Sequence, residues 1–443
     1  MQTSPLSLSF PAVAHRQVIA RFDGGDLTSD AGVALLAAAD RRAGVTASLA
    51  AAITDRRDPA KVEHPLLDLL RERVYAIAQG YEDANDLDRL RHDPALKVAC
   101  GRLPQTGDAL GSQPTLSRLE NAVTPRELRA MALALAQSVV AQLPVGTTAV
   151  VLDVDATDDP CHGQQQLECF NGFYDAHCYL PLLLYVTGPD GRQRLLGALL
   201  RPGNAKGTKG LQTLLKWAAR LLRARFPGVR ILLRGDSGFG NATVLRWCHA
   251  LGLGYRLCVA QNPVLQERSI PVQLDAALQA TFPRAGEDGQ EFGEFLYRAG
   301  SWRRAERVIV KAEVTRGKLN PRFVVTSEDA LPEAEYRHYC ARGDRENRIK
   351  EFKLGLASGR TSCHRFWANQ CRLLLHLAAS VLMSVLQTAL QGTVWAAAQV
   401  DTLRTRLLKI GGRVVESCRK VWLHLPTACP AQEIWLLLQQ RLR

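Results

Sequence analysis

Apolar side chains recur at helical spacing through the first third of the chain. They follow this spacing in residues 31–41 and again in 65–79, so we expect two amphipathic helices there. A stretch rich in glycine and proline, 101–114, predicts a loop. Pro114 then suits the first turn of a further helix. Residues 1–145 are therefore expected to form a mostly helical region.

The pattern changes after Gly146, where runs of β-branched and apolar residues predict buried strands. Amphipathic stretches at 209–225 and 242–251 predict helices between and after the later runs. The expected strands are 147–153, 179–187, 195–200 and 229–234. Three strands followed by a helix and a fourth strand predict an α/β fold built on a mixed sheet.

Residues 254–330 contain short runs typical of β-strands, which interrupt this alternation of strands and helices. Helical spacing of apolar residues returns from Glu333. Residues 373–400 carry no charged side chain and are long enough to cross a bilayer. Polar side chains interrupt them, however, so we expect one helix, or two helices broken near Gly392, buried in the core and no membrane association. The expected domains are 1–145, 146–253 together with 331–400, a β-rich insertion at 254–330, and a helical basic tail at 401–443.

Composition narrows the class of protein. Of the 443 residues, 47% are hydrophobic and 22% are charged, which is typical of a folded globular chain of two or three domains. The net charge is +13, and residues 337–443 hold 17 Lys and Arg against six Asp and Glu. This basic balance favours a polyanionic partner such as nucleic acid. We expect the tail at 401–443 to bind flanking DNA or to join subunits.

The cysteine pattern bears on the cellular compartment. The chain has 11 cysteines with no CxxC pair, and its N-terminus lacks the pattern of a signal peptide. These features favour a reducing, cytoplasmic location.

Candidate chemistry begins with aspartates at the ends of expected strands. Asp153 and Asp155 close the first strand, and Asp236 follows the strand at 229–234. Open α/β sheets place ligands at such carboxyl ends. Asp153 and Asp155 are two positions apart and so face the same side of an extended strand, which leaves either as a possible ligand.

A third carboxylate comes from a segment at 339–353 that reads as one helix. At about 100° per residue, Tyr339, Arg342, Glu346 and Lys353 lie within about 60° of one another on one face. This face carries no aliphatic side chain. It is either a solvated face with pairing between Arg342 and Glu346, or part of a site. Three carboxylates from distant segments can hold two Mg²⁺ ions for in-line phosphoryl transfer.

At these positions the sequence resembles the DDE transposases of prokaryotic insertion sequences. The spacing Tyr339-x2-Arg342-x3-Glu346-x6-Lys353 matches their Y-R-E-K signature. Asp236-Ser237-Gly238-Phe239 matches their second-carboxylate motif, and Asp155-Ala156-Thr157 is similar to their first. The order of strands, carboxylates and insertion between Gly146 and Leu390 is also theirs.

The resemblance implies a ribonuclease H-like catalytic domain that binds two Mg²⁺ ions, or Mn²⁺ in their place, through Asp155, Asp236 and Glu346. Asp155 is favoured over Asp153 because Thr157 follows at the family spacing. The enzyme is expected to cut at insertion-sequence ends and join them to target DNA without a covalent protein–DNA intermediate. Its partner is double-stranded DNA, and members commonly act as homodimers on paired ends. Tyr339, Arg342 and Lys353 are expected to contact DNA phosphates.

Further contacts with DNA are expected outside this signature. Thr115, Ser117 and Arg118 lie at the exposed start of a helix, as in helix-turn-helix proteins, although a capped surface helix has the same pattern. Trp302, with Phe323 and Tyr297, offers stacking to a flipped base, unless these rings pack the core of the insertion.

Other functions remain open from the sequence. A structure-selective, metal-dependent endonuclease would share the three carboxylates, and a non-catalytic DNA-binding protein derived from a transposase would be expected to lack one of them. A basic scaffold that binds RNA would need none of the three.

Overall fold

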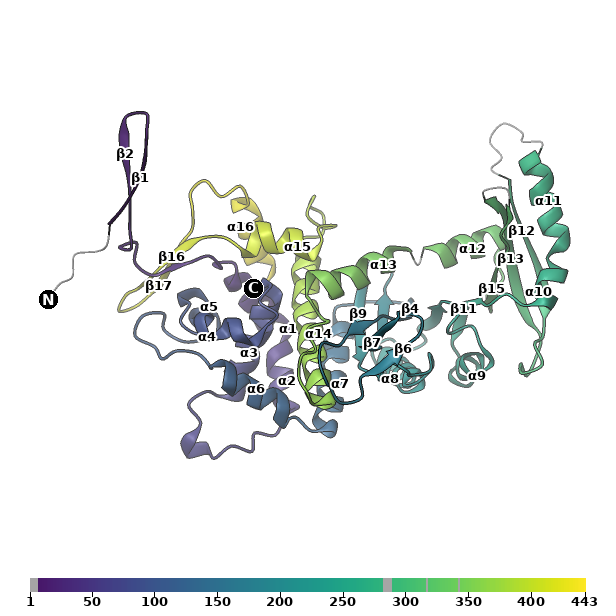
Figure 1. Cartoon of the computed structure of the whole chain (residues 1–443), viewed down its shortest axis with the longest axis horizontal. Helices are drawn as coiled ribbons and strands as arrows, with labels where there is room; N and C mark the ends of the chain where they lie inside the picture. Colours follow the sequence, from purple (N-terminus) through teal and green to yellow (C-terminus); the bar gives the residue numbers. More distant parts are fainter. Residues whose placement is uncertain (1–6, 282–288, 316–317, 342) are drawn as a thin grey trace. The chain divides into compact units, whose positions relative to one another are not determined.

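The computed structural model describes residues 7–281, 289–315, 318–341 and 343–443. Their contacts divide the chain into two units. A terminal unit comprises the residues up to Leu119 and from Leu382 onward, and a central unit comprises Glu120–Val381. Two helices, α6 (Gln113–Ala122) and α14 (Phe366–Ala389), run across the boundaries (Figure 1).

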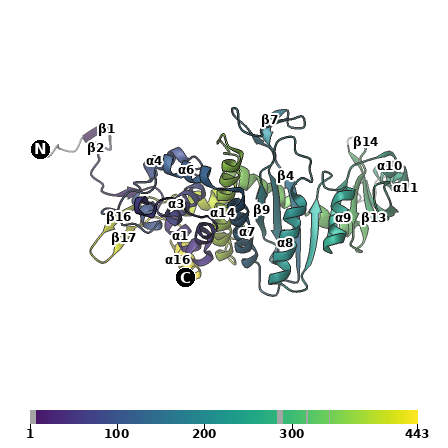
Figure 2. The same ribbon diagram turned by 90° about the horizontal axis from the view of Figure 1, so that it is seen from below.

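A mixed sheet of nine strands forms the core of the central unit (Figure 2). Its strands are β4 (Ala149–Ala156), β8 (Leu182–Thr187), β9 (Gln193–Leu199), β10 (Arg230–Gly235), β11 (Gly254–Val259), β12 (Gln290–Tyr297), β13 (Glu306–Thr315), β14 (Lys318–Leu319) and β15 (Arg322–Thr326). The order is β12-β13-β15-β11-β10-β4-β8-β9, with β14 on β13. Strand β10 pairs in parallel with both β4 and β11, whereas β8 and β9 run antiparallel. The predicted mixed α/β sheet is therefore confirmed.

The predicted β-rich segment at 254–330 continues this sheet. Strand β11 pairs with β10 on one side and with β15 on the other, which brings β13 and β12 into the same sheet. The segment also contains two helices, α10 (Pro263–Arg268) and α11 (Ile270–Thr281). Helix α11 packs on β12 and β13. An open strand edge exposes unpaired backbone groups, and here β15 satisfies those of β11.

Helices and a small second sheet complete the central unit. The helices are α7 (Pro125–Ala141), α8 (Leu211–Arg225), α9 (Ala242–Leu251), α12 (Pro332–Cys340) and α13 (Gly343–Lys350), followed by one turn of π-helix, η3 (Glu351–Gly355). The small sheet has the order β5-β7-β6, with β5 (Asp159–Pro160), β7 (Ala176–Tyr179) and β6 (Cys169–Asn171). Because β5 directly follows β4, this sheet begins where the candidate carboxylates lie.

Helix α14 is the one helix in the described ranges that is long and apolar enough to cross a membrane. In its most apolar window, 78% of the residues are buried inside the structure. Its polar residues find partners there, since His376 bonds through Nδ1 to the Leu356 carbonyl at 2.8 Å and the Arg372 Nε donates to Glu120 at 2.6 Å. These contacts are those of a core helix.

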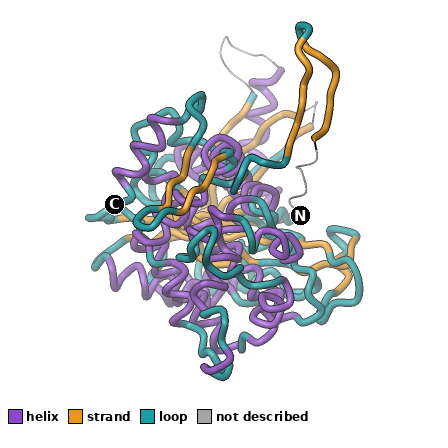
Figure 3. The backbone as a smooth tube through the Cα atoms, turned by 90° about the vertical axis from the view of Figure 1, so that its left-hand side faces the viewer, coloured by secondary structure: helices purple, strands orange, loops and turns teal. Residues whose placement is uncertain are grey.

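The terminal unit is helical but also contains strands that the sequence analysis missed. Its helices are α1 (Val33–Ala43), α2 (Val45–Ala51), η1 (Pro59–Lys61), α3 (Leu66–Gln79), η2 (Ala84–Asp86), α4 (Leu87–Leu90), α5 (Pro94–Ala99), α15 (Val400–Leu403), η4 (Arg404–Leu408) and α16 (Gln432–Arg441). Its strands are β1 (Ser7–Val13), β2 (Arg16–Arg21), β3 (Leu27–Thr28), β16 (Gly412–Glu416) and β17 (Val421–His424). Figure 3 shows β1 and β2 as a hairpin, every residue of which is exposed.

The C-terminal tail was expected to be helical, but it also contains strands. Strands β16 and β17 form a hairpin, and β16 pairs with β3 near the start of the chain. Valines such as Val414 and Val421 favour strands, and the Ser417 hydroxyl closes the turn by donating to the Lys420 carbonyl at 2.8 Å. The two ends of the chain therefore fold together in one unit.

Candidate functional site

Two aspartates lie at the carboxyl ends of adjacent parallel strands. Asp153 on β4 is level with Arg234 on β10 in the pairing register. Continuing this register by two positions brings Asp236, just past β10, level with Asp155. Neighbouring strands lie about 4.8 Å apart, so the two aspartates emerge side by side at one edge of the sheet.

Local backbone contacts orient both aspartates. The Asp236 Oδ1 accepts from the backbone N–H of Gly238 at 2.9 Å, which makes a tight turn after β10. A Cβ at Gly235 would come within 3.1 Å of Val154 and Phe239, so only glycine fits there without a shift. The Asp155 Oδ1 accepts from the Ala156 N–H at 2.9 Å.

Asp153 lies in different surroundings from Asp155. Its side chain is fully buried, and both its oxygens accept from Arg234, at 2.6 Å from Nε and 2.9 Å from the second guanidinium nitrogen. Gln193 donates a further hydrogen bond at 2.9 Å. A carboxylate already saturated by such a pair is a poor ligand for a metal. The structure therefore favours Asp155 of the two alternatives.

Arg234 also connects the sheet to the helices that follow it. Its remaining terminal nitrogen donates to the backbone carbonyl of His338 at 2.7 Å. His338 lies in the last turn of α12, just before the segment that leads to Glu346. One buried guanidinium thus ties together β4, β10 and α12.

Tyr174 lies between β6 and β7, and the pKa of its phenol is raised in part by the carboxylates of this edge. Burial raises the pKa of its phenol, and the negative charges of Asp158, Asp155 and Asp236 raise the pKa further. All three carboxylates therefore lie close enough to Tyr174 to act on it electrostatically. Asp158 and Tyr174 were missed in the sequence analysis, although the run Asp155-Ala156-Thr157-Asp158-Asp159 is conspicuously acidic.

The segment at 339–353 is not the single helix that was predicted. Helix α12 ends at Cys340, α13 begins at Gly343, and the π-helical turn η3 starts at Glu351. Glycine and the sparse apolar residues of this segment provide little to keep a helix continuous. The single helical face inferred from a constant 100° step therefore does not extend from Tyr339 to Lys353.

The residues of the predicted signature are only partly described. Arg342 lies outside the described residues, and Glu346 is placed only as part of the α13 backbone. Tyr339 is half-buried and packs near Tyr336, with ring centroids 6.1 Å apart, against Ile309 and Val324 of the sheet.

Lys353 lies close to the acidic edge. Its Nζ is 2.6 Å from the Asp158 Oδ1, and its side chain is 29% exposed. The π-helical turn that carries Lys353 is thereby held beside the loop that follows β4.

Asp159 is a buried carboxylate next to this pair. Its Oδ2 accepts from the Thr361 hydroxyl at 2.7 Å, and its Oδ1 has no hydrogen-bond donor among the described residues. Burial raises its pKa from 3.8 to about 7, although the Thr361 bond and the Lys353 charge oppose this shift.

Asp159 should make the stability of the central unit depend on pH. Because the folded-state pKa lies above the unfolded one, the unfolded chain releases this proton first. The free energy of unfolding should therefore fall as pH rises from about 4 to about 7, by up to about 4 kcal/mol, and level off above. We expect Asp159→Asn to remove this slope in urea titrations across pH. An unchanged slope in the variant would assign it to other groups.

The other candidate DNA contacts differ in exposure. Helix α6 begins at Gln113, so Pro114 lies in its first turn as predicted; Arg118 is exposed and Thr115 and Ser117 are half-buried. Trp302 is only 6% exposed and packs edge-on against Tyr297 at 5.3 Å. Tyr297 and Phe323 are buried as well, so the structure favours the core alternative for all three rings.

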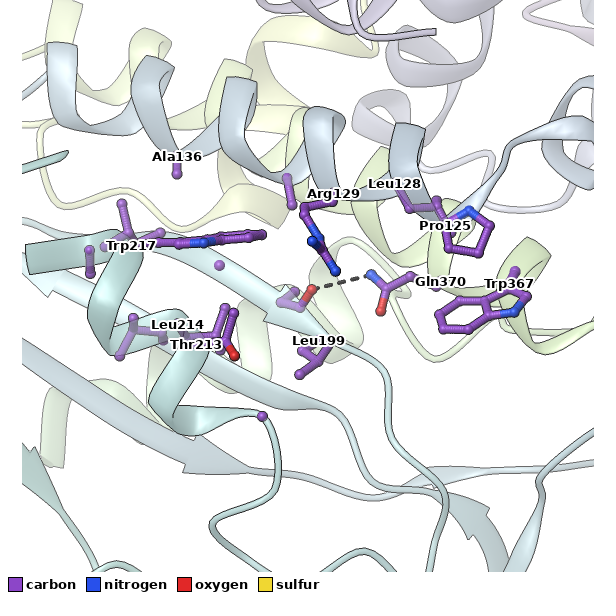
Figure 4. A pocket seen from close by; sticks show the side chains of 17 residues that line it. Pro125, Leu128, Arg129, Ala136, Leu199, Thr213, Leu214, Trp217, Trp367 and Gln370 are labelled. Carbon is purple, nitrogen blue, oxygen red and sulfur yellow. Dashed lines mark hydrogen bonds between the residues drawn. The ribbon is translucent and has the colours of Figure 1, made fainter. Parts of the chain in front are cut away.

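A separate apolar cavity of about 270 Å³ lies between α7, α8 and β9 (Figure 4). Arg129 is its one charged lining residue within the described ranges, and Gln370 donates to the Ala198 carbonyl at 3.3 Å. Neither Asp155 nor Asp236 lines this cavity. The cavity is therefore separate from the carboxylates at the sheet edge.

The donor set at this edge suits a hard divalent cation, because carboxylate oxygens are the ligands that Mg²⁺ prefers. Among the residues whose side chains are described, which leaves out Glu346, no three Asp, Glu, His or Cys side chains are grouped closely enough to hold a metal ion.

The fold and this edge define an α/β protein with an aspartate at the end of each of two adjacent parallel strands. A comparison with protein families identifies the class more closely. The family model for the transposase DDE domain, group 1, matches residues 10–443. The chain belongs to this family of transposases, whose members generally use divalent metals and act on DNA. No curated protein sequence matches the chain.

Proposed function

We propose that the chain is an active transposase that cuts DNA at the ends of an insertion sequence and joins those ends to a target. The observation that carries this proposal is the placement of Asp155 and Asp236 at adjacent parallel strand ends. Helix α13, with Glu346, follows α12, which Arg234 ties to the same two strands.

We further propose that the central unit has a ribonuclease H-like core. Its support is the strand order β9-β8-β4-β10-β11, in which three antiparallel strands precede two parallel ones. In this core Asp155, Asp236 and Glu346 would hold two Mg²⁺ ions. Such ions, when bound, stabilise the attacking and leaving oxygens of phosphoryl transfer.

The cations around the site would position the DNA. Lys353 is already beside the site through Asp158, and its Nζ can exchange this carboxylate for a phosphate oxygen of the substrate. Arg342 and Tyr339 precede Glu346 in the chain and would hold neighbouring phosphates. Arg118 and its neighbours on α6 would contact the DNA further along. We expect two copies to act on paired ends in the cytoplasm, as the family resemblance implies.

Strand transfer separates this function from that of a metal nuclease. Purified protein with Mg²⁺ and pre-cut DNA ends carrying a free 3′-hydroxyl should join those ends to a supercoiled plasmid. Ends with a 3′-deoxy terminus are the matched control and should not be joined. Cutting of branched DNA without any end joining would instead support a structure-selective nuclease.

A further inference from the structure

Two cysteines lie directly opposite each other in the small sheet of the central unit. In the antiparallel pairing of β6 with β7, Cys169 is the register partner of Cys178, and both are free thiols. Opposed residues on antiparallel strands place their side chains on the same face, with Cα atoms about 4.5–5.5 Å apart. A disulfide spans Cα atoms about 4.4–6.8 Å apart, so the backbone already holds these thiols at a distance that a disulfide can bridge.

The chain around Gly203 holds the two strands in this register. A Cβ at Gly203 would lie 2.3 Å from the Cys178 carbonyl oxygen and 2.4 Å from that of Cys169, so the glycine backbone lies directly against the pair. The Asn171 Nδ2 donates to the Gly203 carbonyl at 2.7 Å. Because these contacts fix both strands, the cysteines are kept opposite each other.

The two thiols differ in their surroundings. Cys169 is half-buried, whereas Cys178 is fully buried. Burial raises the pKa of the Cys178 thiol, and the negative charges of Asp158, Asp159 and a Cys169 thiolate raise the pKa further. The two sulfurs are therefore close enough to act on each other. Cys169 is the thiol that a small oxidant in solution reaches first.

Other uses of these sulfurs fit the structure less well. Among the described residues, no group of three Cys, His, Asp or Glu side chains could hold a metal ion, so a zinc site has too few ligands. The third thiol of this sheet is that of Cys161, but the register partner of Cys178 on β5 is Pro160. The Cys161 Sγ instead donates to the Asp159 carbonyl at 3.8 Å. The pair of Cys169 with Cys178 is therefore the one that the strands align.

We propose that Cys169 and Cys178 are a redox-sensitive pair that closes to a disulfide when the protein meets hydrogen peroxide. The Cys169 thiolate attacks one peroxide oxygen, the O–O bond breaks, and the leaving hydroxide takes up the thiol proton as water. The sulfur of Cys178 then attacks that of the Cys169 sulfenic acid. The S–S bond forms as the S–O bond breaks, and the Cys178 proton leaves with the hydroxide as a second water. Two thiols are oxidised and one peroxide is reduced.

The disulfide would close a loop next to the candidate carboxylates. The turn between β6 and β7 carries Tyr174, whose phenol is acted on by the charges of Asp155 and Asp236. Linking the strands on either side of this turn removes conformations from the loop at 170–177. Disulfides of cytosolic proteins are usually transient and sense redox conditions, which fits a pair that is free here. The thiol chemistry is independent of the proposed function.

The test is a peptide map of the full chain after treatment with hydrogen peroxide. Free thiols are alkylated, and the chain is cut under non-reducing conditions by a protease that cleaves after aromatic residues, three of which, Phe170, Phe173 and Tyr174, lie between the two cysteines. We expect a linked peptide pair that has lost two hydrogens and is released by dithiothreitol. Hydrogen exchange at 170–177 should slow severalfold in the oxidised protein and return to its first rate on reduction.

Matched variants decide between the outcomes. Cys169→Ala and Cys178→Ala should each abolish the linked pair, whereas Cys418→Ala, at an exposed thiol, should leave it unchanged. Wild type oxidised in urea should lose the selectivity for this pair, because the strands no longer align it. If Cys418 is oxidised while Cys169 and Cys178 stay free, or if either links to Cys161 instead, the proposal is overturned. Because no arm uses DNA, its failure is distinct from a failure to cut or join ends.

Discussion

Replacing Glu346 with Gln should abolish DNA cleavage while leaving DNA binding intact. If Glu346 completes the metal site with Asp155 and Asp236, its loss removes a ligand that the chemistry requires. Metal-ion catalysis supplies several kcal/mol of transition-state stabilisation, so cleavage should slow by about 10³-fold or more. The measurement is single-turnover cleavage of end DNA with Mg²⁺, alongside affinity for the same DNA in EDTA.

A matched control lies on the preceding helix. Glu333 on α12 forms an exposed ion pair with Arg337, and Glu333→Gln should leave both rate and affinity unchanged. If Glu346→Gln cleaves DNA at the wild-type rate, Glu346 is not part of the metal site. Loss of binding and cleavage together would instead indicate a folding defect, which circular dichroism and thermal unfolding would detect.

Replacing Arg234 with Met should produce the largest loss of stability. The variant leaves the Asp153 carboxylate buried without its partner, and breaking a buried ion pair costs about 3–5 kcal/mol. The double variant Asp153→Leu/Arg234→Met removes both charges and should recover most of this loss. Urea unfolding of the four proteins in the cycle measures the coupling between the two residues.

Activity should not recover together with stability in the double variant. The contact from Arg234 to the His338 carbonyl is missing there, so α12 and the following α13 lose their link to the strands that carry Asp155 and Asp236. Arg372→Met provides the control, since it breaks another buried pair, with Glu120, on helices other than α12. It should lose similar stability but keep its cleavage rate where it remains folded. A double variant that cleaves like wild type would show that the link is dispensable.

The sequence predicted well those features that local pattern determines. Strands β4 and β10 were predicted from their apolar residues, and they pair in parallel, with Asp155 near the end of β4 and Asp236 just past β10. The mixed sheet followed from the order of these runs. The buried character of α14 followed from the polar residues that interrupt its apolar stretch.

Features that depend on distant partners could not be predicted in the same way. Asp153 and Asp155 have the same local sequence pattern. Only the folded structure shows that Arg234, which lies opposite Asp153 on β10, forms an ion pair with Asp153. The end of α12 at Cys340 depends on how the segment packs, which a fixed helical step ignores. The hairpin of β16 and β17 pairs with β3, about 385 residues earlier, and no local signal encodes such a contact. Trp302 illustrates the same limit, because burial by Tyr297 depends on the folded sheet.

The most direct test of the account is a structure of the protein with end DNA and Mn²⁺, using Glu346→Gln as the comparison. Anomalous scattering locates the metal independently of the protein model. We predict metal bound by Asp155, Asp236 and Glu346 beside the scissile phosphate in wild type, with weakened occupancy in the variant. Metal at another group of side chains, or DNA bound away from this sheet edge, would contradict the account.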